Sequence, residues 1–358
     1  MKFGQFYLLE TPPGTDHSVV YHEAFEQFRL LDETGWDAIW LAEHHFDHRV
    51  PEANYYSITP SIHTMAAYAA AITKRIKIGT AVVVLPFHHP VIVAEDFATV
   101  DIMSKGRLLL GVGRGYQFEE FYNWGLDLDE SRDRFQESLE IILKAWTGPF
   151  EHEGRFYQIR PVNVVPKPVQ APHPPVYVAA VSPSTYEWVI KNGYNVLTSF
   201  LDPYPKVFEA YEQYHKIAEQ VGLSGKLDFP LARFLYVSDT TSQAREQCRE
   251  SLLWYFRTLL ASLIAPPADI APPDQDEGFY RDLQEKFRTI SYEQILEDHS
   301  VIGDPDYVTE RLKWIEANTG TQHFIGWTRM GKLAPELVCK SLRMFADTVM
   351  PQFKETTV

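Results

Sequence analysis

Residues Met103–Glu120 read MSKGRLLLGVGRGYQFEE, and the interpretation of the whole chain starts from them. The stretch joins a short apolar run, Leu108–Val112, to a turn that carries one cation, Arg114. Glycines stand at alternate positions over Gly111–Gly115, and without their Cβ atoms a flat ligand can approach the backbone closely. The stretch therefore predicts a buried strand that leads into a ligand-binding turn.

Two nucleotide-binding signatures come close to matching this chain, and both fail. The glycine turn is not the G-x-G-x-x-G dinucleotide fingerprint, because Tyr116 occupies the position of a required glycine. The segment Gly326–Leu333, GWTRMGKL, has the spacing of a phosphate-binding loop, but Leu333 replaces the Ser or Thr that would bind magnesium. Taken alone, the first turn is a strand-to-helix corner with a surface arginine, so its meaning depends on the rest of the chain.

The composition is that of a globular chain with enough apolar residues for a large core. The chain has 358 residues, of which 45% are hydrophobic and 14% aromatic. Barrels of alternating strands and helices reach this length as one unit, so we expect a single domain over residues 1–358. Two cysteines, Cys248 and Cys339, are too few for a disulfide framework or a cysteine metal site, and fit a reducing compartment.

Charge and hydropathy exclude several classes of partner. The 33 basic and 48 acidic residues give a net charge of -15, whereas nucleic acids and anionic membranes are bound through clustered Lys and Arg. No apolar run approaches the ~20 residues of a membrane span. The first residues, MKFGQFYLLE, alternate like a strand rather than a signal peptide. We therefore expect a cytoplasmic protein with no nucleic-acid or membrane partner.

Apolar runs and amphipathic helices alternate along the chain. Each run is nearly unbroken, which is typical of parallel strands buried on both faces. The predicted strands are 2–8, 37–42, 76–85, 108–112, 176–181, 196–200, 231–237 and 323–327. The predicted helices are 19–34, 61–71, 91–103, 131–146, 184–191, 204–221, 243–263, 305–319 and 335–350.

Eight strand-helix units predict a (β/α)₈ TIM barrel, an α/β fold. Two segments interrupt the repeat. The turn HEGRFY within residues 149–168 predicts a small β-hairpin outside the barrel. The proline-rich acidic segment Ala265–Glu277, APPADIAPPDQDE, fits no regular element.

Polar residues follow four consecutive predicted strands. In such barrels the functional groups lie at the carboxyl ends of strands. Here Glu43, His44 and His45 follow the second strand, His88 and His89 the third, Arg114 the fourth, and Ser182, Ser184 and Thr185 the fifth.

The histidines at the strand ends have three possible roles. As metal ligands they lack the usual spaced pairing, because adjacent residues on an extended segment point to opposite sides. One of each pair can be a hydrogen-bonded structural group. A histidine at a strand end can also act as a base or hydrogen-bond donor near neutral pH. The pattern disfavours metal and leaves the structural and catalytic roles open.

The run Ser182-Pro183-Ser184-Thr185 is a typical helix start, with Ser182 as N-cap and Pro183 in the first turn. The same arrangement presents free backbone N–H groups and hydroxyls, which bind anions. With Arg114 one strand away, a phosphate held between the ends of the fourth and fifth strands is the sharper hypothesis. The two interpretations are compatible.

Five collinear blocks carry a resemblance to the bacterial luciferase family of flavin-dependent monooxygenases, and in particular to the luciferase α subunit. They extend over nearly the whole chain. The blocks are MKFGQF at the start, WLAEHHF at Trp40–Phe46, IGTAVVVLPFHHP at Ile78–Pro90, MSKGRLLLGVGRG at Met103–Gly115, and PVYVAAVSPSTYEW at Pro175–Trp188.

The resemblance implies a two-component TIM-barrel monooxygenase. Such an enzyme takes reduced FMN from a separate flavin reductase, reacts it with O₂, and uses the resulting C4a-peroxyflavin on a small organic substrate. The reaction would be carbonyl oxidation, Baeyer–Villiger chemistry or hydroxylation. Family members are commonly dimers, so a homodimer is expected.

The resemblance also implies roles for individual positions. His44 would be the catalytic histidine and Glu43 its neighbour in the site, with His45 and His89 around them. Arg114, Ser182 and Thr185 would bind the FMN phosphate, and Ala81 and Val82 would form a cis peptide beneath the flavin ring. The remaining residues implied to line the flavin are Tyr116, Ala180 and Ser199.

Two positions depart from the luciferase α pattern. Gly113 stands where that subunit has a reactive cysteine beside the flavin, so any role of the thiol is absent and light emission is not implied. Val181 replaces a glutamate of the phosphate site, which removes one hydrogen bond but leaves Arg114 and the hydroxyls.

The resemblance places a mobile lid at residues 265–288, which would shield the reaction from water. Aromatic residues near the expected barrel mouth, among them Phe46 and Trp254, favour an apolar or aromatic substrate. Two alternatives within the fold are a deazaflavin-dependent hydride-transfer enzyme, which would work without oxygen, and a non-catalytic flavin-binding protein. A metal-dependent hydrolase is a more distant alternative.

Overall fold

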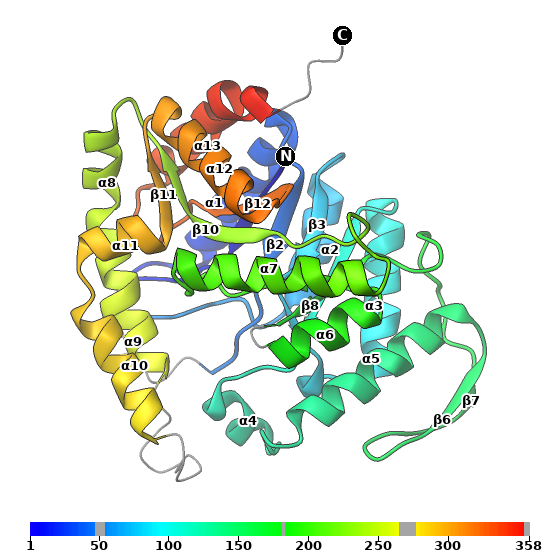
Figure 1. Ribbon diagram of the computed structural model, residues 1–358. Helices are drawn as coiled ribbons and strands as arrows, with labels where there is room; N and C mark the ends of the chain where they lie inside the picture. Colours follow the sequence, from blue (N-terminus) through cyan, green and yellow to red (C-terminus); the bar gives the residue numbers. More distant parts are fainter. Residues whose placement is uncertain (47–53, 181–182, 265–276, 354–358) are drawn as a thin grey trace.

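The computed structural model describes residues 1–46, 54–180, 183–264 and 277–353 (Figure 1). Ten strands form one sheet with parallel pairings, and two more form an antiparallel hairpin. The sheet strands are β1 (Lys2–Tyr7), β2 (Ala38–Leu41), β3 (Lys77–Thr80), β4 (Val83–Val84), β5 (Leu108–Gly113), β8 (Val176–Ala179), β9 (Asn195–Leu197), β10 (Leu231–Val237), β11 (Ser300–Gly303) and β12 (His323–Trp327). The hairpin strands are β6 (Phe150–Glu153) and β7 (Gln158–Val162).

Helices surround the sheet, and the hairpin projects beyond α5 (Figure 1). The α-helices are α1 (His17–Thr34), α2 (Ile62–Ile72), α3 (Pro90–Ser104), α4 (Phe118–Trp124), α5 (Ser131–Thr147), α6 (Pro183–Lys191), α7 (Tyr204–Gln220), α8 (Thr241–Trp254), α9 (Ala261–Ile264), α10 (Glu277–Thr289), α11 (Tyr292–Asp298), α12 (Pro305–Thr319) and α13 (Pro335–Met344). Short 3₁₀ turns are η1 (Leu85–Phe87) and η4 (Met350–Phe353), and π turns are η2 (Tyr255–Leu260) and η3 (Phe345–Val349). None of the helices in the described part of the chain combines the length and apolar character needed to cross a bilayer.

The strand order is that of the predicted α/β barrel. The ladder runs β10-β12-β1-β2-β3-β5-β8-β9, and β11 pairs with the second half of β10. Among the described residues no ladder joins β9 to β10, and single hydrogen bonds span this interval instead. The Val196 N–H donates to the Asp228 carbonyl (3.0 Å), and the Arg233 guanidinium donates to the carbonyls of Phe200 (3.3 Å) and Asp202 (2.7 Å).

The inside of the sheet is filled by a small cluster of side chains around Trp40, which is fully buried. Its indole lies edge-on to Tyr177, with ring centroids 5.0 Å apart. A Cβ on Gly4 or Gly79 would come within 2.8 Å or 2.4 Å of the indole, so glycine at both positions makes room for it. The other members of the cluster are Ala38, Leu109, Leu197 and Ile325.

Asp228 ties the amino-terminal ends of several strands together. Its carboxylate accepts from the Tyr177 hydroxyl (2.9 Å) and lies 2.8 Å from the His323 ring. Burial alone would raise the pKa of Asp228, but His323, Lys2 and Tyr177 together lower it below the ordinary value. This end of the sheet is therefore a stability element, opposite the end where function is expected.

The predicted elements exist with boundaries close to those expected, and three differences stand out. The predicted strand 76–85 is divided into β3 and β4, with the cis Ala81–Val82 peptide between them. The predicted helix 243–263 is interrupted by the π turn η2. Four elements were not predicted. β11, α4 and α11 have seven residues or fewer, too few for a clear periodicity, and the 13-residue α10 lies within the segment predicted as a lid.

Part of the predicted lid, residues 265–276, lies outside the described residues. The rest of the lid belongs to α10, which packs on α9 and η2. The Gln284 side chain donates to the Ala261 carbonyl (2.9 Å), and the rings of Phe287 and Phe256 lie 5.8 Å apart.

Candidate active site

The residues that follow β2, β3 and β5 share one edge of the sheet, because these are neighbouring parallel strands. Glu43 connects two of the segments directly. Its side chain is fully buried, and its Oε2 accepts from the Val84 N–H at 2.9 Å. The end of β2 is thereby fixed against β4, immediately after the Ala81–Val82 peptide.

The other oxygen of Glu43 bonds two imidazoles. The ring Nε2 atoms of His45 and His88 lie 2.9 Å and 2.5 Å from Glu43 Oε1. Burial opposes ionisation of this carboxyl, but the hydrogen bonds from His45 and His88, the charge of His88 and the Val84 N–H outweigh it and lower the pKa of Glu43 to about 2. Glu43 is therefore an ionised buried carboxylate at neutral pH.

The same three side chains place one potential metal-ligand atom each within 4.8 Å of one another. The prediction against metal considered adjacent histidines, whereas this cluster uses alternate residues, Glu43 and His45, which point to the same side of an extended segment. Both ring nitrogens lie at hydrogen-bonding distance from one carboxylate oxygen. Hydrogen bonding therefore accounts for the positions of all three side chains.

His44 points to the opposite side and has its own carboxylate. Its Nδ1 lies 3.3 Å from Oε1 of Glu120, and the same oxygen accepts the His45 backbone N–H at 2.8 Å. The Gln117 side-chain amide lies 3.0 Å from His44 Nδ1. Glu120 is 2% exposed, so a second buried carboxylate stands behind the imidazole of His44.

The sequence placed His88 among the candidate histidines at the strand ends, but it did not single out Glu120 or Gln117. Gln117 is the residue before α4 and Glu120 lies in its first turn, both within the stretch with which the interpretation began. Two consecutive acids directly after the glycine turn were the signal that could have pointed to Glu120. The signal is weak, since acids in the first turn of a helix are also explained by favourable interaction with the helix dipole.

Aromatic rings extend from His44 across the end of the sheet. The Tyr56 ring lies 4.9 Å from the imidazole and the Tyr116 ring 6.2 Å. Tyr56 in turn stacks on Tyr255 (6.2 Å), which contacts Trp327 (4.9 Å). Burial raises the pKa of the Tyr56 and Tyr255 phenols well above 10, so both hydroxyls keep their protons at neutral pH.

A further buried carboxylate, Glu10, follows β1. Its Oε1 accepts the Gly331 N–H (2.8 Å), and its Oε2 lies 3.7 Å from the Arg329 guanidinium. Burial raises the pKa of Glu10 to about 7, although Arg329 acts in the opposite direction. Glu10 therefore exchanges its proton close to neutral pH.

A model of the luciferase-like monooxygenases matches residues 1–323. The chain belongs to this family. The match covers more than half of the chain and includes the ends of β1, β2, β3, β4 and β5. The fold prediction and the family resemblance are both confirmed.

Curated relatives align with this luciferase-like chain from end to end. The oxygenase component of flavin-dependent trigonelline monooxygenase from Acinetobacter baylyi is 31% identical, over 100% of this chain and 97% of the relative. The alkanal monooxygenase alpha chain of Photorhabdus luminescens is 28% identical, over 99% and 98%.

Solved structures with the same fold include enzymes of two cofactor types. Monooxygenase RslO1 from Streptomyces bottropensis superposes with a TM-score of 0.82 at 25% identity, over 99% of this chain and 100% of that one. The oxygenating constituent of 3,6-diketocamphane monooxygenase from Pseudomonas putida, in complex with FMN, gives 0.79 at 20% identity, over 98% of both chains. An F420-dependent secondary alcohol dehydrogenase gives 0.75 at 18% identity, over 99% of both.

The glycine turn of this luciferase-like chain packs against the segment that contains the Ala81–Val82 peptide. Ala81 and Val82 are half-buried and pack on the Trp40 cluster inside the sheet, so they form an apolar floor. A Cβ on Gly113 would come within 2.5 Å of the Val82 side chain, and one on Gly111 within 1.7 Å of the Thr80 carbonyl oxygen. A side chain at either glycine would collide with these neighbours, and the apolar floor that they form is compatible with a flat flavin ring.

The residues implied for the phosphate lie on two neighbouring strands. Arg114 is exposed directly after β5, and Thr185 is half-buried in the first turn of α6, after β8. Val112 and Val178 are register partners in these strands, so both segments leave the sheet at the same edge. Val181 and Ser182 lie outside the described residues.

The other residues implied by the resemblance have identifiable local roles. His89 is exposed and caps α3, where its Nδ1 accepts the Val91 N–H at 3.3 Å. The Ser199 hydroxyl accepts the Leu201 N–H at 3.0 Å, and the Ala180 N–H donates to the Leu197 carbonyl at 2.8 Å. Phe46 is 41% exposed with its ring 5.2 Å from Trp124, and the indole N–H of the buried Trp254 donates to Asn54 Oδ1 at 2.9 Å.

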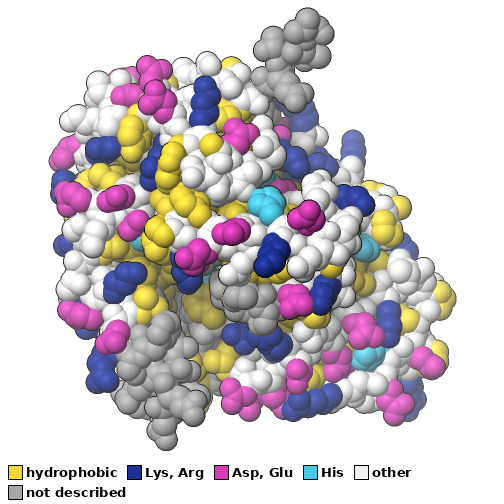
Figure 2. All heavy atoms as spheres, viewed as in Figure 1, with side chains coloured by type: hydrophobic (Ala, Val, Ile, Leu, Met, Phe, Trp, Pro, Cys, Tyr) yellow, Lys and Arg dark blue, Asp and Glu magenta, His cyan; other side chains and the backbone are white. Residues whose placement is uncertain are grey.

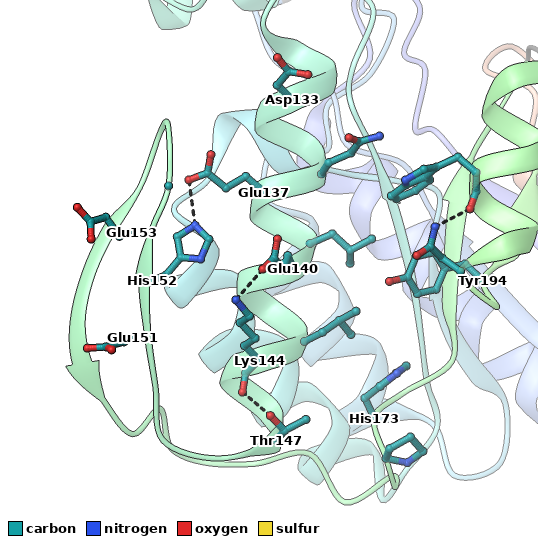
Figure 3. A pocket seen from close by; sticks show the side chains of 17 residues that line it. Asp133, Glu137, Glu140, Lys144, Thr147, Glu151, His152, Glu153, His173 and Tyr194 are labelled. Carbon is teal, nitrogen blue, oxygen red and sulfur yellow. Dashed lines mark hydrogen bonds and ion pairs between the residues drawn. The ribbon is translucent and has the colours of Figure 1, made fainter.

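A groove of about 1040 Å³ lies away from this site, between α5, the hairpin and α6 (Figure 3). One of its acidic side chains, Glu137, holds the hairpin against α5, and another, Glu140, pairs within α5. Glu137 lies 3.1 Å from the His152 ring and accepts the N–H groups of Phe156 and Tyr157, and Glu140 pairs with Lys144 at 2.6 Å. Hydrogen bonding and ion pairing therefore account for the positions of Glu137 and Glu140.

Charged side chains of both signs are interspersed on the face shown in Figure 2, with hydrophobic side chains between them. Lys and Arg do not gather into one basic patch on this face. A nucleic-acid-binding surface depends on such a patch.

Proposed function

We propose that the chain is the oxygenase component of a two-component monooxygenase that uses reduced FMN and O₂. One oxygen atom of O₂ enters the organic substrate and the other leaves as water, with two electrons supplied by reduced FMN. The relative from Acinetobacter baylyi is an oxygenase component, so a separate flavin reductase is the proposed electron source.

One juxtaposition carries the proposal. The glycine turn contacts the Ala81–Val82 floor through Gly113 and approaches His44 through Tyr116, 6.2 Å from the imidazole. A flat ring against the turn would therefore face an imidazole that is backed by a buried carboxylate, Glu120. This is an arrangement in which a proton can be held or moved beside a bound cofactor.

The residues divide the work of binding and chemistry. Arg114 and Thr185, with Ser182, would hold the phosphate, while Ala81 and Val82 would support the ring. Reduced FMN, when bound, would supply the two electrons that activate O₂. The imidazole of His44 would accept or return the proton that moves as oxygen is transferred, and the aromatic rings around it would keep water out.

The lining favours an apolar or aromatic substrate. Tyr56 lies 4.9 Å from the His44 imidazole, and Tyr255 and Trp327 follow it ring by ring. Aromatic rings bind flat organic molecules through such contacts. We propose oxygenation of a carbonyl carbon, by aldehyde oxidation or Baeyer–Villiger insertion, or hydroxylation of a ring carbon.

Substitution of His44 by Ala tests the catalytic part of the proposal. With pre-reduced FMN, ¹⁸O₂ and a panel of aldehydes, ketones and aromatic compounds, the wild type should give product with one ¹⁸O per turnover. His44→Ala should lower this yield at least about 100-fold, in line with the loss of a general acid-base group. His22→Ala, on the exposed face of α1, is the control. Wild-type yield from His44→Ala would contradict the assignment.

Substitution of Arg114 by Ala tests the cofactor part separately. Loss of a charge-assisted phosphate contact should weaken binding of reduced FMN by about 10- to 100-fold, measured anaerobically. The affinity for reduced riboflavin, which has no phosphate, should be unchanged. Arg160→Ala, on the exposed hairpin strand β7, is the matched control. Equal losses for both flavins would remove Arg114 from the phosphate site.

A deazaflavin-dependent dehydrogenase is the second candidate, because an F420-dependent enzyme shares the fold at a TM-score of 0.75. Anaerobic hydride transfer from a reduced deazaflavin, with no activity from reduced FMN, would support it. We also propose that the chain forms a homodimer, which analytical ultracentrifugation of the purified chain would test. A cytoplasmic location is proposed as well, and cell fractionation would test it.

A further inference from the structure

The carboxylate of Glu120 contacts the imidazole and the backbone beside it through one oxygen. Oε1 lies 3.3 Å from His44 Nδ1 and 2.8 Å from the His45 backbone nitrogen, and the side chain is 2% exposed. The backbone N–H can only donate, so Oε1 acts as an acceptor in this pair of contacts. The contact with His44 depends on which ring nitrogen carries the proton.

Two tautomers of His44 are compatible with the neighbouring heavy atoms. In one, Nδ1–H donates to Glu120 and Nε2 keeps a lone pair. In the other, Nδ1 accepts from the Gln117 amide, which lies 3.0 Å away, and Nε2 carries the proton. The orientation of the Gln117 amide does not show which tautomer is present, because its oxygen and nitrogen can exchange places without a change in shape.

Electrostatics favours the first tautomer. In the second, the Nδ1 lone pair would face a buried carboxylate oxygen at 3.3 Å with no proton between them. In the first, the buried carboxylate gains a charge-assisted hydrogen bond, and the Gln117 amide can turn its oxygen toward the ring. Leaving a buried carboxylate without this donor would cost more than reorienting an amide.

We propose that Glu120 is the positioning residue for His44: it holds the proton on Nδ1 and so presents Nε2 as the acceptor in the site. This inference rests on the proposed role of His44. It deepens that role, because the same imidazole with the proton on Nε2 would be a donor and not a base. A carboxylate behind a catalytic histidine has this effect in the Ser-His-Asp triad, where the amide replacement keeps the geometry and lowers kcat about 10⁴-fold.

The glycine turn explains why this residue can reach the imidazole. Gly115 adopts φ +78, a left-handed conformation, and a Cβ there would come within 2.8 Å of Val84 and 3.0 Å of Phe121. The chain therefore reverses tightly after β5 and begins α4 at Phe118, which returns Glu120 to the end of β2. The flavin-facing turn and the histidine-positioning carboxylate are consequently parts of one continuous segment.

Two variants separate positioning from a merely structural role. Glu120→Gln keeps the size of the side chain and an acceptor for the His45 N–H, but its amide can donate to His44 Nδ1. Glu120→Asp keeps the carboxylate on a shorter arm. ¹⁵N NMR of histidine-labelled protein, with the His44 signals assigned by their absence in His44→Ala, reports the tautomer without requiring turnover.

The expected wild-type spectrum shows a protonated Nδ1 and an unprotonated Nε2 for His44. Glu120→Gln should reverse this pattern and lower kcat at least about 100-fold while leaving the KM for reduced FMN within about twofold. Glu120→Asp should restore the Nδ1 tautomer and at least about one tenth of the activity. Glu151→Gln, an exposed acid on β6, should match wild type in both measurements.

Three results would overturn the inference: a protonated Nε2 in the wild type, an unchanged tautomer in Glu120→Gln, or unchanged kcat in that variant. If Glu120→Gln fails to fold, the wild-type spectrum and Glu120→Asp still decide the question. Full product yield from His44→Ala would contradict the catalytic role of His44. The positioning of its proton by Glu120 would then be tested by the ¹⁵N spectra and not by kcat.

Discussion

Replacement of Glu43 by Gln should destabilise the protein strongly at neutral pH. The carboxylate is fully buried and holds three donors, on His45, His88 and Val84, that an amide of the same shape cannot satisfy together. A pKa of about 2, against an ordinary value of 4.5, corresponds at about 1.4 kcal/mol per tenfold to about 3 kcal/mol of stability from the ionised form. Glu43→Gln resembles the protonated form, so the expected loss at pH 7 is about 3 kcal/mol.

The sign of the pH dependence follows from the lowered pKa of Glu43. The contribution is complete above pH 4.5, where the unfolded chain has also lost its proton, and disappears as the pH falls toward 2. Wild type and Glu43→Gln should therefore differ by about 3 kcal/mol at pH 7 and by about 1 kcal/mol less at pH 4. Urea unfolding at both values, followed by tryptophan fluorescence, measures the two differences.

Glu151→Gln is the control for this experiment, since its carboxylate is exposed and its expected effect is below about 0.5 kcal/mol at either pH. A loss in Glu43→Gln that stays constant between pH 7 and pH 4 would mean that the ionised carboxylate is not the source of the stability. A loss no larger than that of the control would refute the hydrogen-bonded cluster itself.

The remaining predictions concern the glycine turn, Glu10 and metal. Gly111→Ala should destabilise the protein by at least about 3 kcal/mol in urea unfolding, because the new Cβ would lie 1.7 Å from a backbone oxygen. The Cβ of Gly113→Ala would meet only the Val82 side chain, at 2.5 Å, so adding Val82→Ala should restore the stability lost in Gly113→Ala. As the pH rises from 4.5 to 8, the free energy of unfolding of the wild type should fall by about 3 kcal/mol relative to that of Glu10→Gln. The reason is that the pKa of Glu10 is raised to about 7 in the folded protein, so protonation of this carboxyl stabilises the fold only at lower pH. Parallel plots of unfolding free energy against pH for the two proteins would contradict this. Dialysis against EDTA should leave product yield unchanged, and loss restored by a divalent metal would assign an ion to the Glu43 cluster.

The fold was predictable because it depends on patterns that extend over many residues. Strands such as β5 are continuous apolar runs, and α1 ends at Gly35, which adopts φ +83 as a helix-terminating glycine does. The division of β3 from β4 was not derivable from hydropathy, since Ala81 and Val82 continue the same apolar run through the cis peptide. The position of the cis peptide was implied by the family resemblance, and the hydropathy pattern gave no sign of it.

The candidate site was predictable only where its residues stand directly at strand ends. Glu43, His44 and His45 could be located in this way, but their pairing could not, because pairing depends on which side of the segment each side chain takes. Glu120 reaches His44 across 76 residues of sequence, and His88 reaches Glu43 across 45. Such contacts are set by how loops return to the sheet edge, which no local pattern encodes.

Gly113 shows how a departure from the family pattern can be compensated within the fold. The resemblance places a cysteine of luciferase α at this position, and here the space beside the missing Cβ is taken by Val82, 2.5 Å from where that atom would stand. A thiol could enter only if Val82 moved, and Val82 forms half of the cis peptide and part of the apolar floor. Gly113 on β5 and Val82, which faces it, therefore pack as one unit, and neither could be enlarged without a change in the other.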